Sequence, residues 1–310
     1  MSVVEIQNLT KSYGSVQALR DVTFEVGHGV TGLLGPNGAG KSTLLLCVLG
    51  LLPGWQGEVR VLDLDARRKR REIRRHVGFM PELDARLPGT TAIKAVRYLG
   101  RLTGLPYSQA LRRAHEVLWH VGLGEAVYRD LQEYSSGMHQ RFKLAQALVH
   151  DPQLLFLDEP LGGMDPAGRD ELLDLVRDLA TNHGKHIVWS SHILPEVQKV
   201  ADEVVILEQG TFRGRFSLDE LEPADHHYRI TVDGDLDAYV RVLADAGIDG
   251  AALSPVPASI DLTLPDAKDA HDLFRLARLA GVRLRRVAPL GQDLEDVFLR
   301  LVGTGSEATS

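Results

Sequence analysis

Cysteine is almost absent from this chain, in which Cys47 is the single one among 310 residues. One cysteine excludes an intrachain disulfide framework and a zinc site built from cysteines, and such sparing use is typical of a reducing compartment. Long apolar runs are also missing, because the longest, residues 44–52, is about half of the roughly 20 residues that a membrane-spanning helix needs. The first five residues show no basic segment leading into an apolar one, so we expect no secretory signal.

An excess of positive charge is lacking as well. The formal net charge is −7, which argues against a general nucleic-acid binder. Apolar residues make up 44% and charged residues 25%, close to the averages for soluble domains, so the chain can bury a real core and is not disordered as a whole. We therefore expect a cytoplasmic protein of two domains that reaches a membrane only through a partner.

The first block, residues 1–216, alternates short apolar runs with helical patterns, an order typical of an α/β domain. Three of the apolar runs are expected to be strands of a parallel sheet that is buried on both faces: residues 30–34, 154–157 and 186–189. Residues 90–130 show helical patterns and no convincing strand, so we place a helical subdomain over about 88–150.

A second, smaller domain is expected after the first block. Residues 217–225 are polar and contain a proline, as in a linker, and residues 226–304 read as a small α+β domain. The predicted order is strand–helix–strand–strand–helix–strand, which is the ferredoxin-like pattern. Its strands are expected at 228–232, around 252, around 260 and at 282–287, and its helices at 236–246 and 270–277.

The strongest local signal is a glycine-rich loop between a predicted buried strand and a predicted helix. It fits the pattern G-x-x-x-x-G-K-[ST] and consists of Gly35, Pro36, Asn37, Gly38, Ala39, Gly40, Lys41, Ser42 and Thr43. Glycines let the backbone curl so that its N–H groups point at phosphate oxygens, and the helix N-terminus adds positive charge. Lys41 can reach the β- and γ-phosphates, and the Ser42 hydroxyl can ligate Mg²⁺. The loop therefore predicts a nucleotide-binding site.

Two carboxylates, Asp158 and Glu159, end the predicted strand that follows 115 residues later. Side chains at the carboxyl end of such a strand emerge into the crevice where open α/β sheets bind ligands. Asp158 would hold Mg²⁺ through a water, and Glu159 would polarise the attacking water, because phosphoryl transfer needs an oriented nucleophile. Alone, the pair could cap a helix on a solvent-facing turn; beside the upstream loop it favours catalysis.

With these two motifs, further stretches in the same order resemble the ATP-binding subunit of an ABC transporter. The resemblance covers residues 3–216. The additional matches are Tyr13 for the aromatic residue that stacks on adenine, Tyr134-Ser135-Ser136-Gly137-Met138 for the signature loop, Gly163-Met164-Asp165 for the loop that crosses to the partner subunit, and Ser190-Ser191-His192 for the switch histidine.

This resemblance implies a P-loop ATPase of the ABC type, with a mixed sheet core, a helical subdomain, and ATP and Mg²⁺ as ligands. Lys41, Glu159 and His192 would be the catalytic residues. Each ATP would lie between residues 35–43 of one subunit and Ser135, Ser136 and Gly137 of a second copy or a close relative.

The transport step would belong to a separately encoded integral membrane permease, which implies a peripheral position on the inner face of the cell membrane and no nucleic-acid partner. The short stretch 294–298 resembles the closing segment of subunits that serve multidrug, antibiotic and polysaccharide exporters. The resemblance therefore implies export, with residues 226–304 in a regulatory or dimer-supporting role.

Three departures from the family pattern matter. The place of the usual glutamine holds Glu82, which can ligate Mg²⁺ but adds negative charge beside Asp158 and Glu159. The signature loop has Ser136 for a glycine and Met138 for the glutamine, and the Ser136 side chain could crowd the partner's phosphate or supply another hydroxyl donor. The crossing loop, residues 161–164, reads Leu-Gly-Gly-Met where a serine and a leucine are usual.

The basic run at residues 67–75 allows three readings: a solvated helix face, a surface for the anionic inner leaflet, or a nucleic-acid contact. The solvated helix face is the reading we favour. Apart from His192, the eleven other histidines show no grouping that indicates a metal site.

The main alternative function is that of a soluble ABC-type ATPase that acts in translation or on DNA. Translation-type members usually carry two ATPase blocks, whereas this chain has one phosphate loop, and repair-type members carry long heptad coiled coils, which are not visible here. A small-molecule kinase with a phosphate loop would lack the signature loop and the switch histidine.

Overall fold

The computed structural model describes residues 2–83, 89–218, 227–248, 252–253, 257–265 and 270–289. Contacts within the chain divide it into two compact units, Met1–Leu218 and Asp219–Ser310. The predicted linker lies almost wholly outside the described residues, as does the predicted closing segment 294–298.

The first unit contains two sheets. The smaller one is antiparallel, with the order β2-β1-β4-β5, and its strands are β1 (Val4–Tyr13), β2 (Val16–Val26), β4 (Trp55–Val61) and β5 (Leu64–Asp65). Valine, isoleucine and phenylalanine side chains alternate with exposed ones along parts of β1 and β2, so one face of this sheet is apolar. That face supplies one wall of the core.

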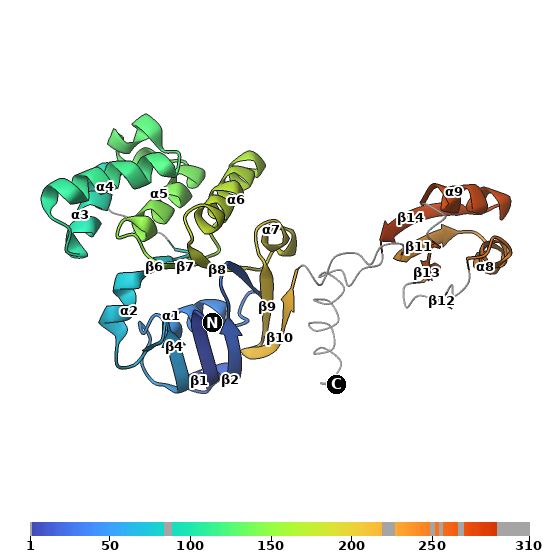
Figure 1. The fold of residues 1–310 in the computed structure, drawn as a ribbon, viewed down its shortest axis with the longest axis horizontal. Coiled ribbons are helices and arrows are strands. Elements are labelled where there is room, and N and C mark those ends of the chain that lie inside the picture. Colours follow the sequence, from blue (N-terminus) through green and yellow to red (C-terminus); the bar gives the residue numbers. More distant parts are fainter. Residues whose placement is uncertain are drawn as a thin grey trace. The chain divides into compact units, whose positions relative to one another are not determined.

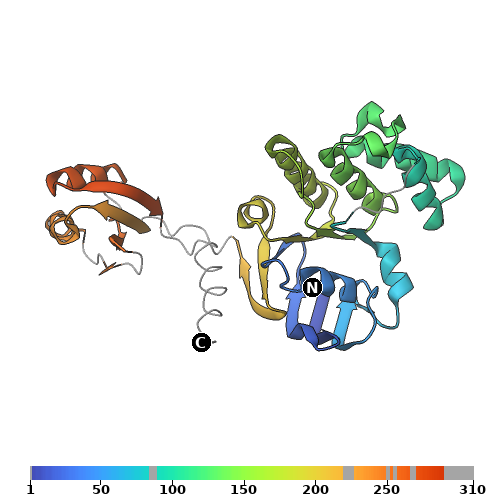
Figure 2. The same cartoon turned by 180° about the vertical axis from the view of Figure 1, so that it is seen from behind.

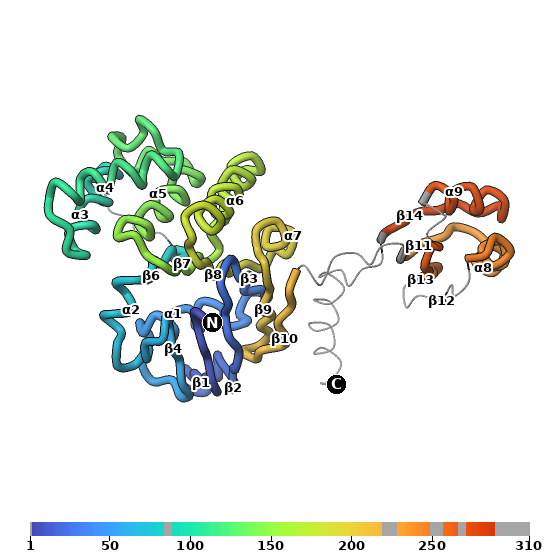
Figure 3. Tube along the Cα trace, in the orientation of Figure 1, coloured from blue at the N-terminus to red at the C-terminus, as the bar shows by residue number. Residues whose placement is uncertain are grey.

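The larger sheet has six strands in the order β10-β9-β3-β8-β7-β6. Its strands are β3 (Val30–Leu34), β6 (Val77–Met80), β7 (Leu154–Asp158), β8 (His186–Ser191), β9 (Glu203–Glu208) and β10 (Thr211–Ser217). All neighbours are parallel except β9 and β10, and Figure 3 shows β7 and β8 between β6 and β3. The three predicted strands are confirmed, and every residue of β3 and β7 is buried. Because the five strands are parallel, the loops that follow them gather at one edge.

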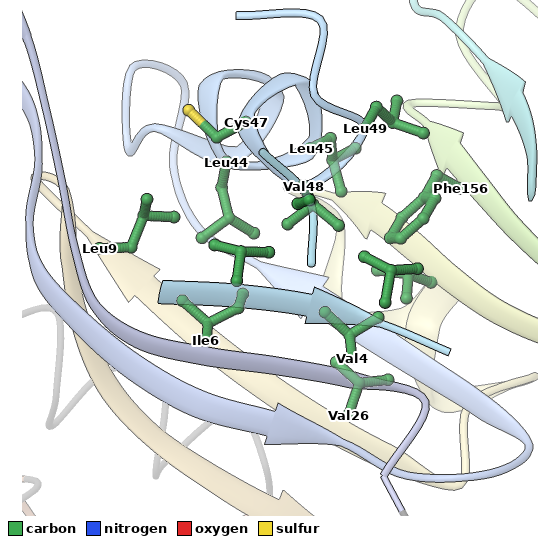
Figure 4. Packing of buried hydrophobic residues seen from close by; sticks show 14 of the residues in the cluster. Val4, Ile6, Leu9, Val26, Leu44, Leu45, Cys47, Val48, Leu49 and Phe156 are labelled. Atoms are coloured by element: carbon green, nitrogen blue, oxygen red, sulfur yellow. The ribbon is translucent and has the colours of Figure 1, made fainter. Parts of the chain in front are cut away.

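Helix α1 (Lys41–Val48) packs between the two sheets. Figure 4 shows its side chains Leu44, Leu45 and Val48 facing residues of both sheets, among them Val4, Ile6, Val26 and Phe156. Leu44 and Leu45 are almost wholly buried, and each such leucine contributes about 1.5–3 kcal/mol through the loss of apolar surface from water. This core therefore holds the start of α1 in a fixed position at the sheet edge.

Helices occupy most of the predicted helical subdomain. They are α3 (Ala92–Leu102), α4 (Tyr107–His120), the short 3₁₀ turns Gly124–Tyr128 and Leu131–Glu133, and α5 (Ser136–Leu148). They gather on one side of the unit in both views (Figure 1, Figure 2). The remaining helices of this unit are α2 (Arg70–His76), α6 (Pro166–Thr181) and α7 (Leu194–Gln198).

The second unit has the predicted βαββαβ order. Its elements are β11 (His227–Asp233), α8 (Leu236–Asp245), β12 (Ala252–Leu253), β13 (Ser259–Thr263), α9 (Ala270–Leu279) and β14 (Arg283–Pro289). The sheet is antiparallel with the order β12-β13-β11-β14, so the ferredoxin-like prediction is confirmed. Both helices contribute to a core of its own, in which the Tyr239 hydroxyl donates to the Leu273 carbonyl at 3.0 Å. None of the helices in the described residues of either unit has the length and apolar composition of a membrane span.

Candidate functional site

The predicted phosphate loop joins β3 to α1. Gly38 and Gly40 have φ angles of 83° and 100°, in the left-handed region that favours glycine. A Cβ at Gly35 would lie 2.2 Å from the Leu207 carbonyl oxygen, and a Cβ at Gly40 would lie 2.7 Å from that of Ala18. Glycine is therefore required where the loop packs against the sheets. Pro36, Asn37 and Gly38 are exposed at its tip, which leaves room for a ligand.

Lys41 lies at the first position of α1 and is 6% exposed. Its Nζ donates to the Gly35 carbonyl at 2.7 Å and lies 3.4 Å from Glu159 Oε1. Ser42 follows at the exposed start of the helix, and Thr43 is half-buried. The ammonium group and the positive end of α1 thus face the same loop, an arrangement suited to phosphate.

The two predicted carboxylates differ in their surroundings. Asp158, the last residue of β7, is 3% exposed, and its Oδ1 accepts no hydrogen bond from the described residues. A buried carboxylate oxygen without a donor fits a cation or a cation-bound water. Glu159 has a left-handed φ of 46°, and its N–H donates to the Ser190 carbonyl at 3.0 Å. Its Oε2 lies 3.0 Å from Nδ1 of His192. The structure therefore brings together Lys41, Glu159 and His192.

The segment after His192 is held by Ser191 and by two residues that sequence reasoning missed, Glu196 and Arg169. The Ser191 hydroxyl accepts from the Ile193 N–H at 3.0 Å and lies 3.3 Å from Glu196 Oε2. Arg169 of α6 donates to the other Glu196 oxygen at 3.1 Å. Burial raises the pKa of Glu196 above its usual value, against the opposing effect of Arg169. The one sequence signal was an acidic residue in the short helix after the histidine.

Glu82 leaves the large sheet at the same edge as Asp158, because β6 runs parallel to β7. Its side chain is exposed. Lys143, a 4% exposed residue of α5, donates to the backbone carbonyls of Pro81 and Glu82 at 2.9 and 2.8 Å. Lys143 was also missed. The backbone at Glu82 is thus fixed to the helical part, whereas its role as a metal ligand stays a prediction.

The predicted signature loop lies at the start of α5. Ser135 is the N-cap residue, and its hydroxyl accepts from the Met138 N–H at 3.3 Å. Tyr134 is buried, donates to the Ala126 carbonyl at 2.8 Å, and has its pKa raised to about 12 by burial. Gly137 follows in the first turn, where an added Cβ would meet Met164 alone among the described residues, at an ordinary 3.6 Å. The exposed helix start is therefore anchored by Tyr134 and Ser135.

Two side chains join α5 to the predicted crossing loop of the same chain. The Ser136 hydroxyl donates to the Gly163 carbonyl at 2.5 Å, and Gln140 Nε2 donates to the Gly162 carbonyl at 2.8 Å. The Ser136 hydroxyl thus has an acceptor inside its own chain, whereas its effect on a partner's phosphate stays a prediction.

Tyr13 ends β1, and its ring is 48% exposed, with Lys11 Nζ 5.0 Å from the ring centroid. In the described part of the chain, neither Tyr13 nor residues 135–137 form a hydrogen bond or ion pair with Lys41, Glu159 or His192. The site within one chain therefore consists of the phosphate loop, the two carboxylates and His192.

Comparison with known proteins places the chain among transport ATPases. The sequence model of the ABC transporter family matches residues 19–162, which include the phosphate loop, the residues at the start of α5 and both carboxylates. The chain is 33% identical to the uncharacterized ABC transporter ATP-binding protein YxlF of Bacillus subtilis (strain 168), over 97% of this chain and 99% of that protein. It is 30% identical to the linearmycin resistance ATP-binding protein LnrL of the same strain, over 97% and 98%.

Solved structures match a smaller part of this chain than the two sequence relatives do. The dimeric structure of the bacterial ABC transporter cassette MJ0796 is 25% identical, covers 69% of this chain and 98% of that chain, and has a TM-score of 0.63. That share is about the size of the first unit. The two sequence relatives instead extend over nearly the whole chain, so their likeness includes the second unit.

Proposed function

The chain belongs to the family of ABC transporter ATP-binding proteins, and on that premise we propose a role for each residue of its site. The protein is an ATPase subunit that dimerises on ATP and powers translocation through a membrane permease. The observation that carries the assignment of residues is the contact of Glu159 with both Lys41 and His192, directly after Asp158.

The phosphate loop, residues 35–43, wraps the phosphates of ATP with its backbone N–H groups. Lys41 exchanges the Gly35 carbonyl for phosphate oxygens, and Tyr13 offers its exposed ring to adenine. Ser42 and Asp158 would hold Mg²⁺, with Glu82 as the candidate third ligand, and a bound ion would supply positive charge to neutralise the phosphates.

Glu159 accepts a hydrogen bond from the attacking water and orients it, while its other oxygen is held by His192. The backbone bond from Glu159 to Ser190 fixes the origin of this side chain, so the carboxylate reaches the water without a search over conformations. Glu196 and Arg169 position His192 indirectly, because they hold the segment that carries it.

The complete site requires two subunits, either two copies of this chain or one copy and a close relative. Ser135, Ser136 and Gly137 of one subunit contact the nucleotide of the other with the positive end of α5. The ATPase domain comprises residues 1–216, with its helical subdomain at about 88–150, and residues 217–225 connect it to an accessory domain at 226–304.

The permease is a separate polypeptide, and through it the protein sits on the inner face of the cell membrane. Export is the direction that the relatives favour, since one of them is named for linearmycin resistance. The alternative, an ATPase in translation or on DNA, has no support from these relatives.

Substitution of Glu159 by glutamine tests this assignment. Glutamine keeps the shape and removes the charge, so Glu159→Gln should bind ATP but hydrolyse it at least about 10²-fold more slowly, as when an electrostatic contact to the transition state is lost. An ATP-stabilised dimer should then accumulate in size-exclusion chromatography. The matched control is Glu58→Gln, at an exposed position of β4. Hydrolysis by Glu159→Gln at the rate of the control would remove Glu159 from this role.

A further inference from the structure

Three side chains with metal-binding atoms meet between the end of α4 and the end of α6. His120 is the last residue of α4, Asp178 lies in the last turn of α6, and His183 follows that helix. Nε2 of His120 and Nε2 of His183 lie 3.8 and 3.5 Å from the same oxygen, Oδ2 of Asp178. The three atoms are all within 4.8 Å of one another. The sequence expectation of no second metal site did not foresee this group, because His120 is far from the other two along the chain.

The spacing of these atoms suits ligands of one ion better than a hydrogen-bonded pair. An N–H···O bond spans about 2.7–3.2 Å, shorter than either nitrogen–oxygen distance here. Around a tetrahedral Zn²⁺, with bonds of about 2.0–2.2 Å, neighbouring ligand atoms lie about 3.3–3.6 Å apart. Small rotations of partly exposed side chains would reach that spacing, since all three side chains are at least one third exposed.

The carboxylate is oriented by a neighbour in the manner of a metal ligand. Asn182 Nδ2 donates to Oδ1 of Asp178 at 2.7 Å, which leaves Oδ2 facing the two imidazoles. Hydrogen bonds of this kind to the outer atom of a ligand fix its direction and commonly accompany metal sites. The two imidazole rings meet edge to face, with centroids 5.0 Å apart.

The basic side chains beside the group are paired with carboxylates. His120 and His183 border a cleft of about 210 Å³ that is also lined by Arg113 and Lys185. Arg113 is paired with Glu116 and Asp151 at 3.4 and 3.3 Å, and Lys185 is paired with Asp151 at 2.8 Å. Arg113 and Lys185 are thus paired with carboxylates other than Asp178, whose own charged neighbours among the described residues are the two histidines.

We propose that His120, Asp178 and His183 form a binding site for Zn²⁺ or a related divalent transition-metal ion. Two imidazoles and one carboxylate suit such ions better than they suit Mg²⁺, which takes oxygen ligands. The exposed side of the group leaves room for a water as the fourth ligand. An ion held there ties α4 of the helical part to the end of α6, which leads back into the large sheet at β8. The site is separate from the ATP site and does not depend on its assignment.

Metal titration of the full chain tests the proposal. Chelator-treated protein, without ATP and with excess Mg²⁺ to fill oxygen-only sites, is titrated with Co²⁺. We expect one equivalent to bind with the visible absorption of a tetrahedral site, and Zn²⁺ to displace it. His120→Ala and His183→Ala should each weaken binding by at least about tenfold, since loss of an outer partner alone costs 10–100-fold.

The matched control is His115→Ala, which removes another exposed histidine of α4 that contacts Tyr128 and not the cleft. Zn²⁺ should raise the thermal midpoint of wild type and of this control by more than that of His120→Ala. Metal-free thermal midpoints of all variants should agree, which verifies folding. Equal metal affinity in His120→Ala, His183→Ala and wild type, equal loss in His115→Ala, or no Co²⁺ absorption in wild type would each overturn the proposal.

Discussion

Glu82 occupies the position where ATPase subunits of this kind usually carry glutamine. Lys143 holds the backbone at this position in place, and a carboxylate there could ligate Mg²⁺. If the carboxylate ligates Mg²⁺, Glu82→Gln should raise the Mg²⁺ concentration needed for half-maximal ATPase activity severalfold, because an anionic ligand becomes neutral. ATP affinity should stay largely intact. A Mg²⁺ titration of ATPase activity, with and without the permease, measures this, and Glu58→Gln is the control. Superimposable titrations would make Glu82 a surface residue.

Glu196 gives the site a pH dependence of stability. Burial raises its pKa above the usual value of 4.5, so the folded state binds this proton more tightly than the unfolded state does. The stabilising contribution of the protonated form is complete below pH 4.5 and is lost as the pH rises through the folded-state pKa. Glutamine cannot ionise, so Glu196→Gln should gain stability relative to wild type between pH 4.5 and pH 7. Urea unfolding at both values tests this, and a pH-independent difference would contradict it.

Sequence reasoning identified the residues of the proposed nucleotide site and missed those that hold them in place. Lys41, Asp158, Glu159 and His192 lie in short motifs whose chemistry is local. Lys143 is different, because a lysine in a helix reads as solvent-facing until its carbonyl partners, about 60 residues away, are known. The pairing of His120 with Asp178 was missed for the same reason, because the two residues are far apart along the chain.

At the scale of the elements, Lys143 links α5 to the end of β6. Lys143→Met keeps the apolar stem and removes the ammonium group, so two carbonyls lose a charged donor. We expect a loss of roughly 1.5–3 kcal/mol in the free energy of unfolding, the range for hydrogen bonds to charged groups. Chemical denaturation measures it, and Lys94→Met, at an exposed position of α3, is the control. A loss no larger than in the control would show that the link carries little energy.

The buried strands of the large sheet could be predicted because each is a short run of apolar residues with every side chain buried. The antiparallel strands β1, β2 and β4 were not identified. Register shifts interrupt the pairing of β1 with β2 and with β4, so the alternation that marks a half-buried strand is broken. Lys11 is even buried there, since its Nζ donates to the Pro53 carbonyl at 2.7 Å.

At the scale of the whole molecule, the second unit has its own core, so the first should fold without it. On α9, Leu273, Leu276 and Ala277 pack inside the second unit, whereas Phe274 is 54% exposed. We expect this unit to add contact between subunits. Deletion of all residues after Pro223 should leave ATP binding intact and make ATPase activity depend more steeply on protein concentration, because the effective concentration of the partner falls.

Dilution series of ATPase activity for the full and shortened chains check this, together with co-purification of the permease. A shortened protein that matches the full chain in both measurements would assign the second unit another role. Phe274→Ser offers a milder version of the same test, since it changes an exposed side chain and leaves the unit's own core in place.

The hydrogen bonds from Ser136 and Gln140 to the crossing loop affect whether the two ATP molecules of the dimer are hydrolysed independently. Gly162, whose carbonyl receives one of them, donates its own N–H to the carbonyl of Glu159 at 3.2 Å. In the proposed dimer, Ser136 contacts the ATP bound by the partner subunit. The hydrogen bonds through Gly163 and Gly162 place it only a few peptide groups from Glu159, the carboxylate that acts on the ATP of its own subunit. The two ATP molecules should then not be consumed as independent events: a subunit whose partner has stalled should itself slow down, so a half-inactivated population loses more than half of its turnover.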